Sequence, residues 1–198
     1  MPSTDRPVYK RLDADTALQH LEKHRKRIET ETNALPLEIF MTLSFQEPDY
    51  EMPPSFYLKA YELCYSRLLR LLIKNNFDRK KHLYPLAYAF FDLPHTSAYK
   101  NAKKDFIVEA LPHIHSVLMI HPYTIDTYVA HRQVLQAEFV KALAERRANT
   151  PVLISLDEQV VDDLSKVVNY SSKLMKDVRH RDYQENPNND LYTIQPSR

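Results

Sequence analysis

The sequence predicts an α+β fold in which helices pack on one central antiparallel sheet. The main observation is the order of its apolar segments, whose periods indicate helix, strand, helix, strand, strand, helix, strand and helix. A hydrophobic fraction of 43% in 198 residues suits the core of one domain. Glycine is absent, so left-handed backbone positions are expected at Asn or Asp, for example Asn33. Its absence also rules out a glycine-rich phosphate loop and argues against ATP-driven helicase chemistry in this chain.

The first helix and the first strand follow from a capping residue and a change of period. Asp13 or Asp15 can cap a helix that runs to about Glu31. Its sparse apolar face consists of Leu18, Leu21 and Ile28. The segment "LEIFMTLSF", from Leu37 to Phe45, predicts a strand with two unlike faces. One face carries Ile39, Met41, Leu43 and Phe45, and the other carries Phe40, Thr42 and Ser44.

A strongly apolar helix and a second strand come next. The helix is predicted from Ser55 to Asn75, because large apolar residues recur there at helical spacing. They are Leu58, Tyr61, Cys64, Tyr65, Leu68, Leu71 and Leu72. After a basic loop, "LAYAFFDL" from Leu86 to Leu93 reads as a strand. The polar segment "PHTSAYKNAKKD" predicts a long exposed excursion before the strand "HIHSVLMI".

The last third of the chain predicts two helices around a short strand. Thr124 can cap a long helix that runs to about Arg147. Its apolar stripe consists of Ile125, Tyr128, Leu135, Phe139 and Leu143. The strand is "PVLISL", and Asp157 can cap a final helix that reaches about Val178. The remaining residues are polar and rich in Pro and Asn, with "LYTI" as a segment that could dock on the fold.

Composition and charge limit the possible domain organisation and cellular compartment of the protein. We expect an N-terminal helical extension over residues 1–35, a main domain over residues 36–178 and a polar C-terminal tail over residues 179–198. A net charge of +1 does not by itself indicate a nucleic-acid binder, so any such binding needs local basic patches. A single cysteine, no signal-like segment and no apolar run of about 20 residues predict a soluble intracellular protein without a membrane partner. We expect it in the cytoplasm, or in the nucleus of a eukaryotic host.

The stretch "PHIHSVLMIHP" contains closely spaced histidines that are candidate metal ligands. His113 and His115 are two apart on a predicted strand, so their side chains share a face, with bases about 6–7 Å apart. Two imidazoles at this spacing can hold one divalent ion. His121 has the same parity but lies about 20 Å further along the strand. The alternative is a pair of surface or edge-strand histidines with no ligand.

A catalytic metal needs a third protein ligand and an open position for substrate. The preceding strand ends in Asp92, which reaches the same end of the sheet if the two strands pair antiparallel. An oxygen ligand of this kind suits Mg²⁺ or Mn²⁺. Asp92 is therefore the predicted third ligand, with Glu109, Asp105 and His95 as competitors, because the excursion leaves the register open.

Three short motifs in this order resemble those of the HUH endonuclease superfamily, which comprises rolling-circle replication initiators, relaxases and single-tyrosine transposases. The first is the strand "FMTLSF", the second is the His-apolar-His strand "HIHSVLMI", and the third is Tyr-x-x-Lys in the helix "VVNYSSKLMKD". The resemblance covers about Leu37 to Asp177. It implies a sheet with a ferredoxin- or RRM-like core and residues 36–178 as the nuclease domain.

The resemblance implies a role for each matching residue. His113 and His115 would hold the metal with Asp92 as third ligand by position, Tyr170 would be the nucleophile, and Lys173 matches the accompanying lysine. Two departures are visible: Ser116 stands where the family often has a small residue such as glycine, and a second motif tyrosine is absent. The chain therefore reads as a single-tyrosine enzyme that nicks and joins DNA through a 5′-phosphotyrosine link.

The residues around Tyr170 support the same role. At about 100° per residue, Tyr170 lies on the flank of the apolar arc of the last helix, with Lys173 one turn on. An ammonium group and a metal-polarised phosphate both favour attack by a phenolate whose free pKa is about 10. The alternative is a half-buried tyrosine that anchors the helix. Asp163, also on this helix, reads as a solvated first-turn charge that complements the helix dipole.

Such chemistry requires unpaired DNA, so the expected substrate is single-stranded or hairpin DNA. Basic clusters could neutralise its phosphates; the predicted contacts are Arg67, Arg70, Lys74, Lys80, Lys176 and Arg179. Tyrosines 84, 99, 123 and 183 could stack on bases. Because the chain has no helicase motif, a separate helicase or replication machinery is the expected partner.

Four other readings remain open from the sequence. One is a transposase or relaxase of the same fold, which differs in the DNA end that is rejoined. Another is a DNA- or protein-binding module in which the histidines are incidental. A third is a metal-dependent hydrolase that uses water, for which Tyr170 would be dispensable and His113 would not. The fourth is a catalytically dead relative, of which the sequence gives no sign.

Overall fold

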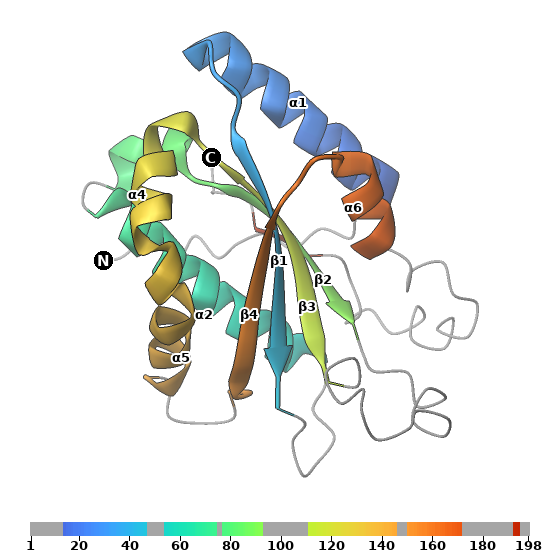
Figure 1. The fold of residues 1–198 in the computed structure, drawn as a ribbon, viewed down its shortest axis with the longest axis vertical. Coiled ribbons are helices and arrows are strands. Elements are labelled where there is room, and N and C mark those ends of the chain that lie inside the picture. The colour runs from blue at the N-terminus through green and yellow to red at the C-terminus, as the bar shows by residue number, and fades with distance from the viewer. Residues whose placement is uncertain are drawn as a thin grey trace.

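The computed structural model describes residues 14–46, 54–74, 77–92, 111–145, 150–171 and 192–194, without the side chains of residues 14, 54, 77, 78, 92, 170, 171 and 192–194. It confirms the predicted α+β class, with an antiparallel sheet covered by helices (Figure 1). The strands are β1 Leu37–Phe45, β2 Leu86–Asp92, β3 His113–Ile120, β4 Leu153–Val160 and β5 Tyr192–Ile194. The helices are α1 Ala14–Thr32, α2 Pro54–Ile73, α4 Ile125–His131, α5 Leu135–Ala144 and α6 Leu164–Ser171. Short 3₁₀ turns are η1 Phe77–Leu83, η3 Pro122–Thr124 and η4 Arg132–Val134.

The sheet has the strand order β4-β1-β3-β2-β5. Its pairings are all antiparallel, and the chain runs β1, α2, β2, β3, α4–α5, β4 through the core, which is the ferredoxin-like β-α-β-β-α-β arrangement. β3 lies in the middle, between β1 and β2. The predicted docking of the "LYTI" segment is confirmed for its backbone, because β5 pairs with β2 at the sheet edge.

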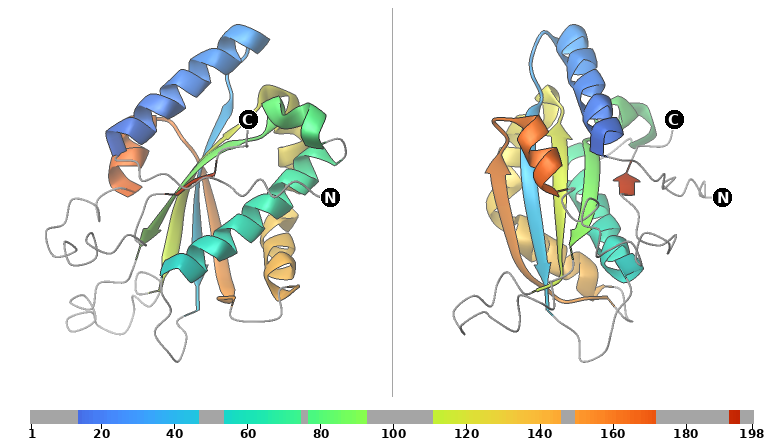
Figure 2. Two further views of the ribbon diagram at one scale, coloured as in Figure 1. Left: turned by 180° about the vertical axis from the view of Figure 1, so that it is seen from behind. Right: turned by 90° about the vertical axis from the view of Figure 1, so that its right-hand side faces the viewer.

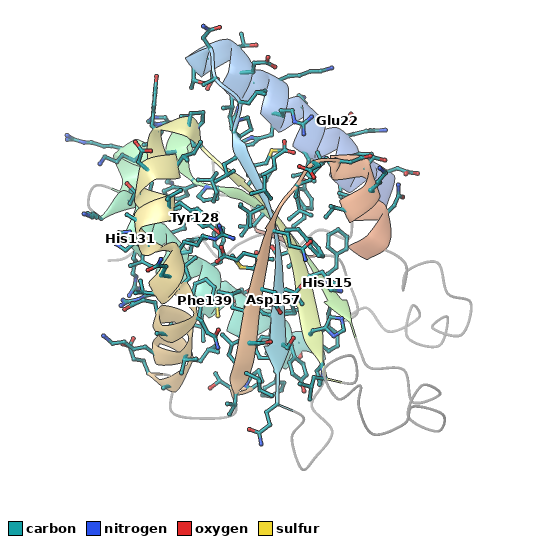
Figure 3. The ribbon with its side chains drawn as sticks, viewed as in Figure 1. Glu22, His115, Tyr128, His131, Phe139 and Asp157 are labelled. Carbon is teal, nitrogen blue, oxygen red and sulfur yellow. The ribbon has the colours of Figure 1, made fainter. Side chains whose placement is uncertain are left out.

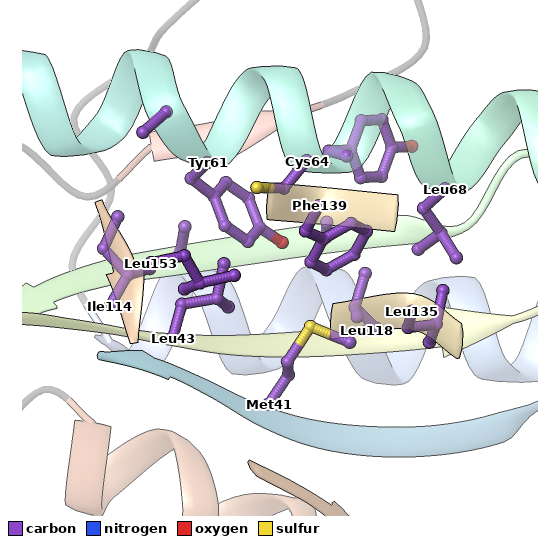
Figure 4. Close-up of a cluster of buried hydrophobic side chains, with 14 of the residues drawn as sticks. Met41, Leu43, Tyr61, Cys64, Leu68, Ile114, Leu118, Leu135, Phe139 and Leu153 are labelled. Atoms are coloured by element: carbon purple, nitrogen blue, oxygen red, sulfur yellow. The ribbon is translucent and has the colours of Figure 1, made fainter. Parts of the chain in front are cut away.

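The larger hydrophobic cluster lies between the sheet and the helices α2, α4 and α5. The alternation predicted for β1 is confirmed, because Met41 and Leu43 point into this cluster together with Leu118 of β3. Tyr61 and Cys64 of α2 cover them, as Figure 4 shows. Burial of so many aliphatic and aromatic side chains on one face stabilises the sheet and fixes its register.

The opposite face carries a smaller cluster under α1 and α6. Phe40 of β1, Val117 of β3 and Tyr88 of β2 face these two helices. Both helices lie on the same side of the sheet, and α2 lies on the other (Figures 1 and 2). Since both faces of β3 are covered, seven of its eight residues are buried. No described helix is long and apolar enough to cross a membrane.

An ion pair anchors α1 to the first strand. Both guanidinium nitrogens Nε and Nη2 of Arg25 bind the carboxylate of Glu38, which is only 6% exposed. On the next turn towards the N-terminus, His20 Nδ1 lies 3.0 Å from the hydroxyl of Tyr88. A bidentate ion pair fixes the relative orientation of its two partners better than a single contact does. The pair therefore helps to determine where α1 crosses the sheet.

The predicted start of the last helix is wrong. Asp157 does not cap it, because β4 continues past "PVLISL" and pairs with β1 as far as Val160. The cap is Asp163, whose Oδ1 accepts the Lys166 N–H at 3.1 Å and whose pKa this bond lowers. The strand extends because β1 offers it pairing partners over the full length, which the sequence of β4 does not reveal.

The long helix predicted from Thr124 is broken. The chain forms α4, the 3₁₀ turn η4 and then α5, although Tyr128, Leu135 and Phe139 are buried on one stripe as predicted. Thr124 does not cap through its side chain; its hydroxyl donates to the carbonyl of His121 at 3.0 Å. The His121 ring instead accepts the Tyr123 N–H at 3.2 Å and caps the preceding 3₁₀ turn.

The predicted left-handed role of Asn33 is confirmed by its φ of 54°. The second such residue among those described is Lys74, with a φ of 55°, and its N–H closes the end of α2 on the Arg70 carbonyl at 3.2 Å. A helix usually ends this way with Gly or Asn. In a chain without glycine, lysine takes this position at some conformational cost.

Histidines also gather at the other end of β3, away from His113 and His115. The ring of His121 lies 6.3 Å from that of His82, measured between centroids. His24 of α1 is near enough to interact with His121, and its Nε2 is buried without a hydrogen-bond partner among the described residues. Burial, then Arg27, then His121 lower the pKa of His24 to about 4.

Truncation of a central core residue should remove a large part of the stability of the domain. Leu43 is fully buried, so Leu43→Ala should lower the free energy of unfolding by about 2–5 kcal/mol. The matched change Leu35→Ala, at a residue that is 60% exposed, should stay within about 0.5 kcal/mol. Urea denaturation followed by circular dichroism measures both, and equal effects would contradict this account of the core.

The pKa of His24 predicts how stability depends on pH. Its pKa is 6.5 in the unfolded chain and about 4 in the folded one. Between these values the unfolded state binds a proton that the folded state does not, so stability falls as the pH drops from 6.5 towards 4. His24→Gln should reduce this fall in urea denaturation midpoints, and an unchanged pH profile would contradict the burial of a neutral imidazole.

Candidate functional site

The two histidines of "PHIHSVLMIHP" lie side by side where β3 begins. As predicted, they share one face of the sheet, with ring centroids 4.6 Å apart and ring planes at 71°. His115 is buried and His113 is half-buried. At this separation the two imidazoles can bind one metal ion.

Each ring is held through its Nδ1 atom. His113 Nδ1 lies 2.8 Å from the carbonyl oxygen of Leu111, and because a carbonyl can only accept, this nitrogen carries the proton. His115 Nδ1 lies 3.1 Å from the hydroxyl oxygen of Thr42, and Phe40 stacks on the same ring at 5.2 Å. In the tautomer with the proton on Nδ1, the lone pair is on Nε2, the usual arrangement of histidines that bind metals.

The register places Asp92 beside the histidine pair. Asp92 is the Cα partner of His113 in the β2–β3 ladder, so the two residues share a face, as antiparallel pairing predicts. The side chain of Asp92 and the competitors Glu109, Asp105 and His95 lie outside the described part of the structure. Among the side chains that are described, no three His, Cys, Asp or Glu residues form a metal-binding group.

The helix that carries Tyr170 packs on the same face as the histidines. Leu164 and Val168 of α6 belong to the cluster that contains Val117, two residues beyond His115 on β3. α6 starts where β4 ends and runs back along the sheet, and His115 lies beyond its lower end in Figure 3. The backbone of Tyr170 lies in the last turn of α6, while its side chain and Lys173 are outside the described residues.

Polar residues of β1 and β4 continue the histidine face across the sheet. Thr42 is the Cα partner of both His115 and Asp157, and Ser44 is that of both His113 and Ser155. Thr42 therefore lies beside His115, on the neighbouring strand and on the same face. Asp157, labelled in Figure 3, is exposed, and its pairing with Thr42 places it on this face, where the sequence predicted a helix cap instead.

Of the basic residues predicted to bind DNA, the four that the structure describes do not lie around the histidines. α2 packs on the opposite face of the sheet, where Arg67 is paired with Glu138 of α5. Arg70 is exposed on the same helix, and Lys74 is exposed directly after its end. Lys80, in η1, precedes the end of β2 that lies away from His113. The other two predicted contacts, Lys176 and Arg179, lie outside the described residues.

The two predicted base-stacking tyrosines within the described residues also lie away from the histidines. Tyr123 is 72% exposed, but it follows the far end of β3, and Tyr84 is half-buried before β2. Tyr99 and Tyr183 are outside the described residues. The described part of the chain therefore places the two histidines, Thr42 and the helix of Tyr170 on one face, and it does not bring the predicted DNA-binding basic residues or tyrosines to them.

The chain was compared with family models, with curated proteins and with solved structures. No family model, curated protein or solved structure matches it.

Proposed function

We propose that this chain is a metal-dependent endonuclease that nicks and joins single-stranded or hairpin DNA through a tyrosine, as in the initiation of rolling-circle replication. One observation carries the proposal. His113 and His115 lie on the face of the sheet on which α6 packs, and α6 carries Tyr170 in its last turn towards the histidine end. A nucleophile and a metal site have to share one face and one end to act on the same phosphate.

The donor set fits a divalent cation. Two imidazoles and a carboxylate at the register position of Asp92 can bind one divalent ion, and the carboxylate oxygen favours Mn²⁺ or Mg²⁺. These three ligands leave coordination positions for a phosphate oxygen. When bound there, such an ion would act as a Lewis acid on the scissile phosphate. His113 and His115 would bind the ion from the side of the sheet, because both side chains project from its surface.

In the proposed reaction, the phenolate oxygen of Tyr170 attacks the phosphorus atom. The new oxygen–phosphorus bond forms as the bond to the 3′-oxygen of the preceding nucleotide breaks. The phenol gives up its proton and the departing 3′-oxygen gains one, which leaves a 5′-phosphotyrosine and a free 3′-hydroxyl. Lys173, three residues after Tyr170, would supply the cation that favours the phenolate.

The same intermediate serves replication, transposition and transfer. Since the phosphodiester energy is retained in the covalent link, no ATP is required for rejoining. The attack needs a strand that is not paired at the scissile phosphate. A separate helicase or the replication machinery would expose it in duplex DNA.

A covalent protein–DNA adduct is the first expected result. Incubation with a labelled library of single-stranded and hairpin DNA and Mn²⁺ should give an adduct that resists denaturant, and chelator should abolish it. Tyr170→Phe should lower the yield by about 10³-fold or more, because nucleophile loss removes the covalent path. Tyr123→Phe, at an exposed tyrosine beyond the far end of β3, should leave the yield unchanged.

The location of the adduct decides the role of Tyr170. Mass spectrometry of the digested adduct should find the nucleotide on Tyr170, attached through a 5′-phosphate. An undiminished adduct in Tyr170→Phe would refute the assignment of the nucleophile. Cleavage without an adduct in that variant would instead favour hydrolysis by water, and binding without cleavage would favour a binding module.

Metal binding can be measured without DNA. Titration with Mn²⁺ followed by electron paramagnetic resonance should show a site that His113→Ala and His115→Ala weaken by more than about 100-fold, because removal of supporting residues alone typically costs 10–100-fold. His131→Ala is the matched control, because its ring bonds the Thr127 carbonyl at 2.8 Å on α4, over the other face. Equal affinity in all three variants would contradict the metal site.

A further inference from the structure

We infer that Thr42 is a positioning residue of the metal site: its hydroxyl oxygen accepts the Nδ1 proton of His115 and thereby directs the Nε2 lone pair of that ring to the ion. The inference rests on the proposed function, since it concerns the same site. The observation behind it is the separation of 3.1 Å between Thr42 Oγ1 and His115 Nδ1.

The sheet fixes this contact. Thr42 and His115 are Cα partners in the β1–β3 ladder, and β1 is itself held between β3 and β4. Threonine is branched at Cβ, so few side-chain rotamers are open to it. The hydroxyl is therefore presented to the imidazole by a central strand rather than by a loop.

A second side chain of β1 acts on the same ring. Phe40 lies two residues before Thr42 on the same face, and its ring is stacked on His115 at an angle of 25°. Stacking limits the tilt of the imidazole plane, and the hydroxyl selects which nitrogen carries the proton. With the plane and the tautomer both set, the position of the His115 lone pair is determined before an ion arrives.

The choice of tautomer matters because a neutral imidazole has only one lone pair. If Nε2 of His115 carried the proton, it would be a donor and could not bind a metal. As an acceptor, the Thr42 hydroxyl oxygen stabilises the form with the proton on Nδ1 of His115, whereas an alkyl group offers no acceptor. The Nδ1 atom of His113 is bonded instead to the main-chain carbonyl of Leu111.

Two substitutions at Thr42 distinguish the effect of its side-chain shape on Mn²⁺ binding from that of its hydrogen bond. Thr42→Val keeps the branched shape and removes the hydroxyl, and it should weaken Mn²⁺ binding by about 10–100-fold. Thr42→Ser restores the hydroxyl and should bind Mn²⁺ close to the level of the unmodified chain. Thr124→Val is the matched control, since it also removes a hydroxyl bond, to the carbonyl of His121 at 3.0 Å, at the far end of β3.

The tautomer can also be observed directly in the unmodified chain. Long-range ¹H–¹⁵N spectra of the metal-free protein, recorded where the imidazole is neutral, should show His115 with its proton on Nδ1. This measurement requires no variant, so it decides the matter even if Thr42→Val does not fold. A proton on Nε2 of His115 would overturn the inference, as would Mn²⁺ affinity in Thr42→Val equal to that in Thr124→Val.

Mn²⁺ binding by the unmodified chain separates the role of Thr42 from the existence of the metal site. If the unmodified chain binds Mn²⁺ and forms the adduct but Thr42→Val does so equally well, only the role of Thr42 is refuted. If the unmodified chain binds no Mn²⁺, the metal site itself is refuted and the role of Thr42 with it.

Discussion

The pairing of β3 between β1 and β2 is the constraint on which the rest of the structure depends. Each residue of β3 has to point to one of two covered faces, and its odd-numbered residues point towards α1 and α6. Ile114 and Leu118 point the other way, into the larger cluster. A register slip of one residue would move both histidines into that apolar cluster, so the hydrophobic core itself determines where the imidazoles lie.

The two faces of the sheet differ in how much apolar surface they bury. The face under α2 and α5 contains most of the buried apolar side chains and supplies most of the stability. The face under α1 and α6 is apolar only over part of its length, at residues such as Val117 and Tyr88, and changes to polar residues towards the start of β3. A rigid sheet with one strongly packed face can hold polar groups on the other without losing its shape. The site therefore lies on regular strands, where side-chain positions are most reproducible.

Much of this arrangement follows from local sequence patterns. The period of two in "LEIFMTLSF" predicted which side chains of β1 share a face, and the spacing of His113 and His115 predicted that they project together. The antiparallel pairing expected for Asp92 is also observed, at the Cα position opposite His113. These features depend on alternation along a strand, which is a short-range property that a single sequence displays.

The features that the sequence could not supply are those decided by partners far away in the chain. β4 extends through Asp157 because β1 is long enough to pair with it, and no local signal in "LDEQV" distinguishes that strand from a helix start. Arg67 looked like a free phosphate-binding residue, but Glu138 of α5 lies beside it. The contact between Thr42 and His115 joins residues 73 positions apart, so only the sheet register reveals it.

The central claim is that one divalent ion, two imidazoles and the Tyr170 hydroxyl meet on a single face of the sheet. Diffraction from Mn²⁺-soaked crystals, recorded at the manganese absorption edge, tests it directly. The account predicts an anomalous peak about 2.0–2.3 Å from Nε2 of both His113 and His115, with the phenol of Tyr170 on the same side of the sheet. A peak elsewhere, or a Tyr170 side chain directed to the opposite face from an occupied histidine site, would contradict it.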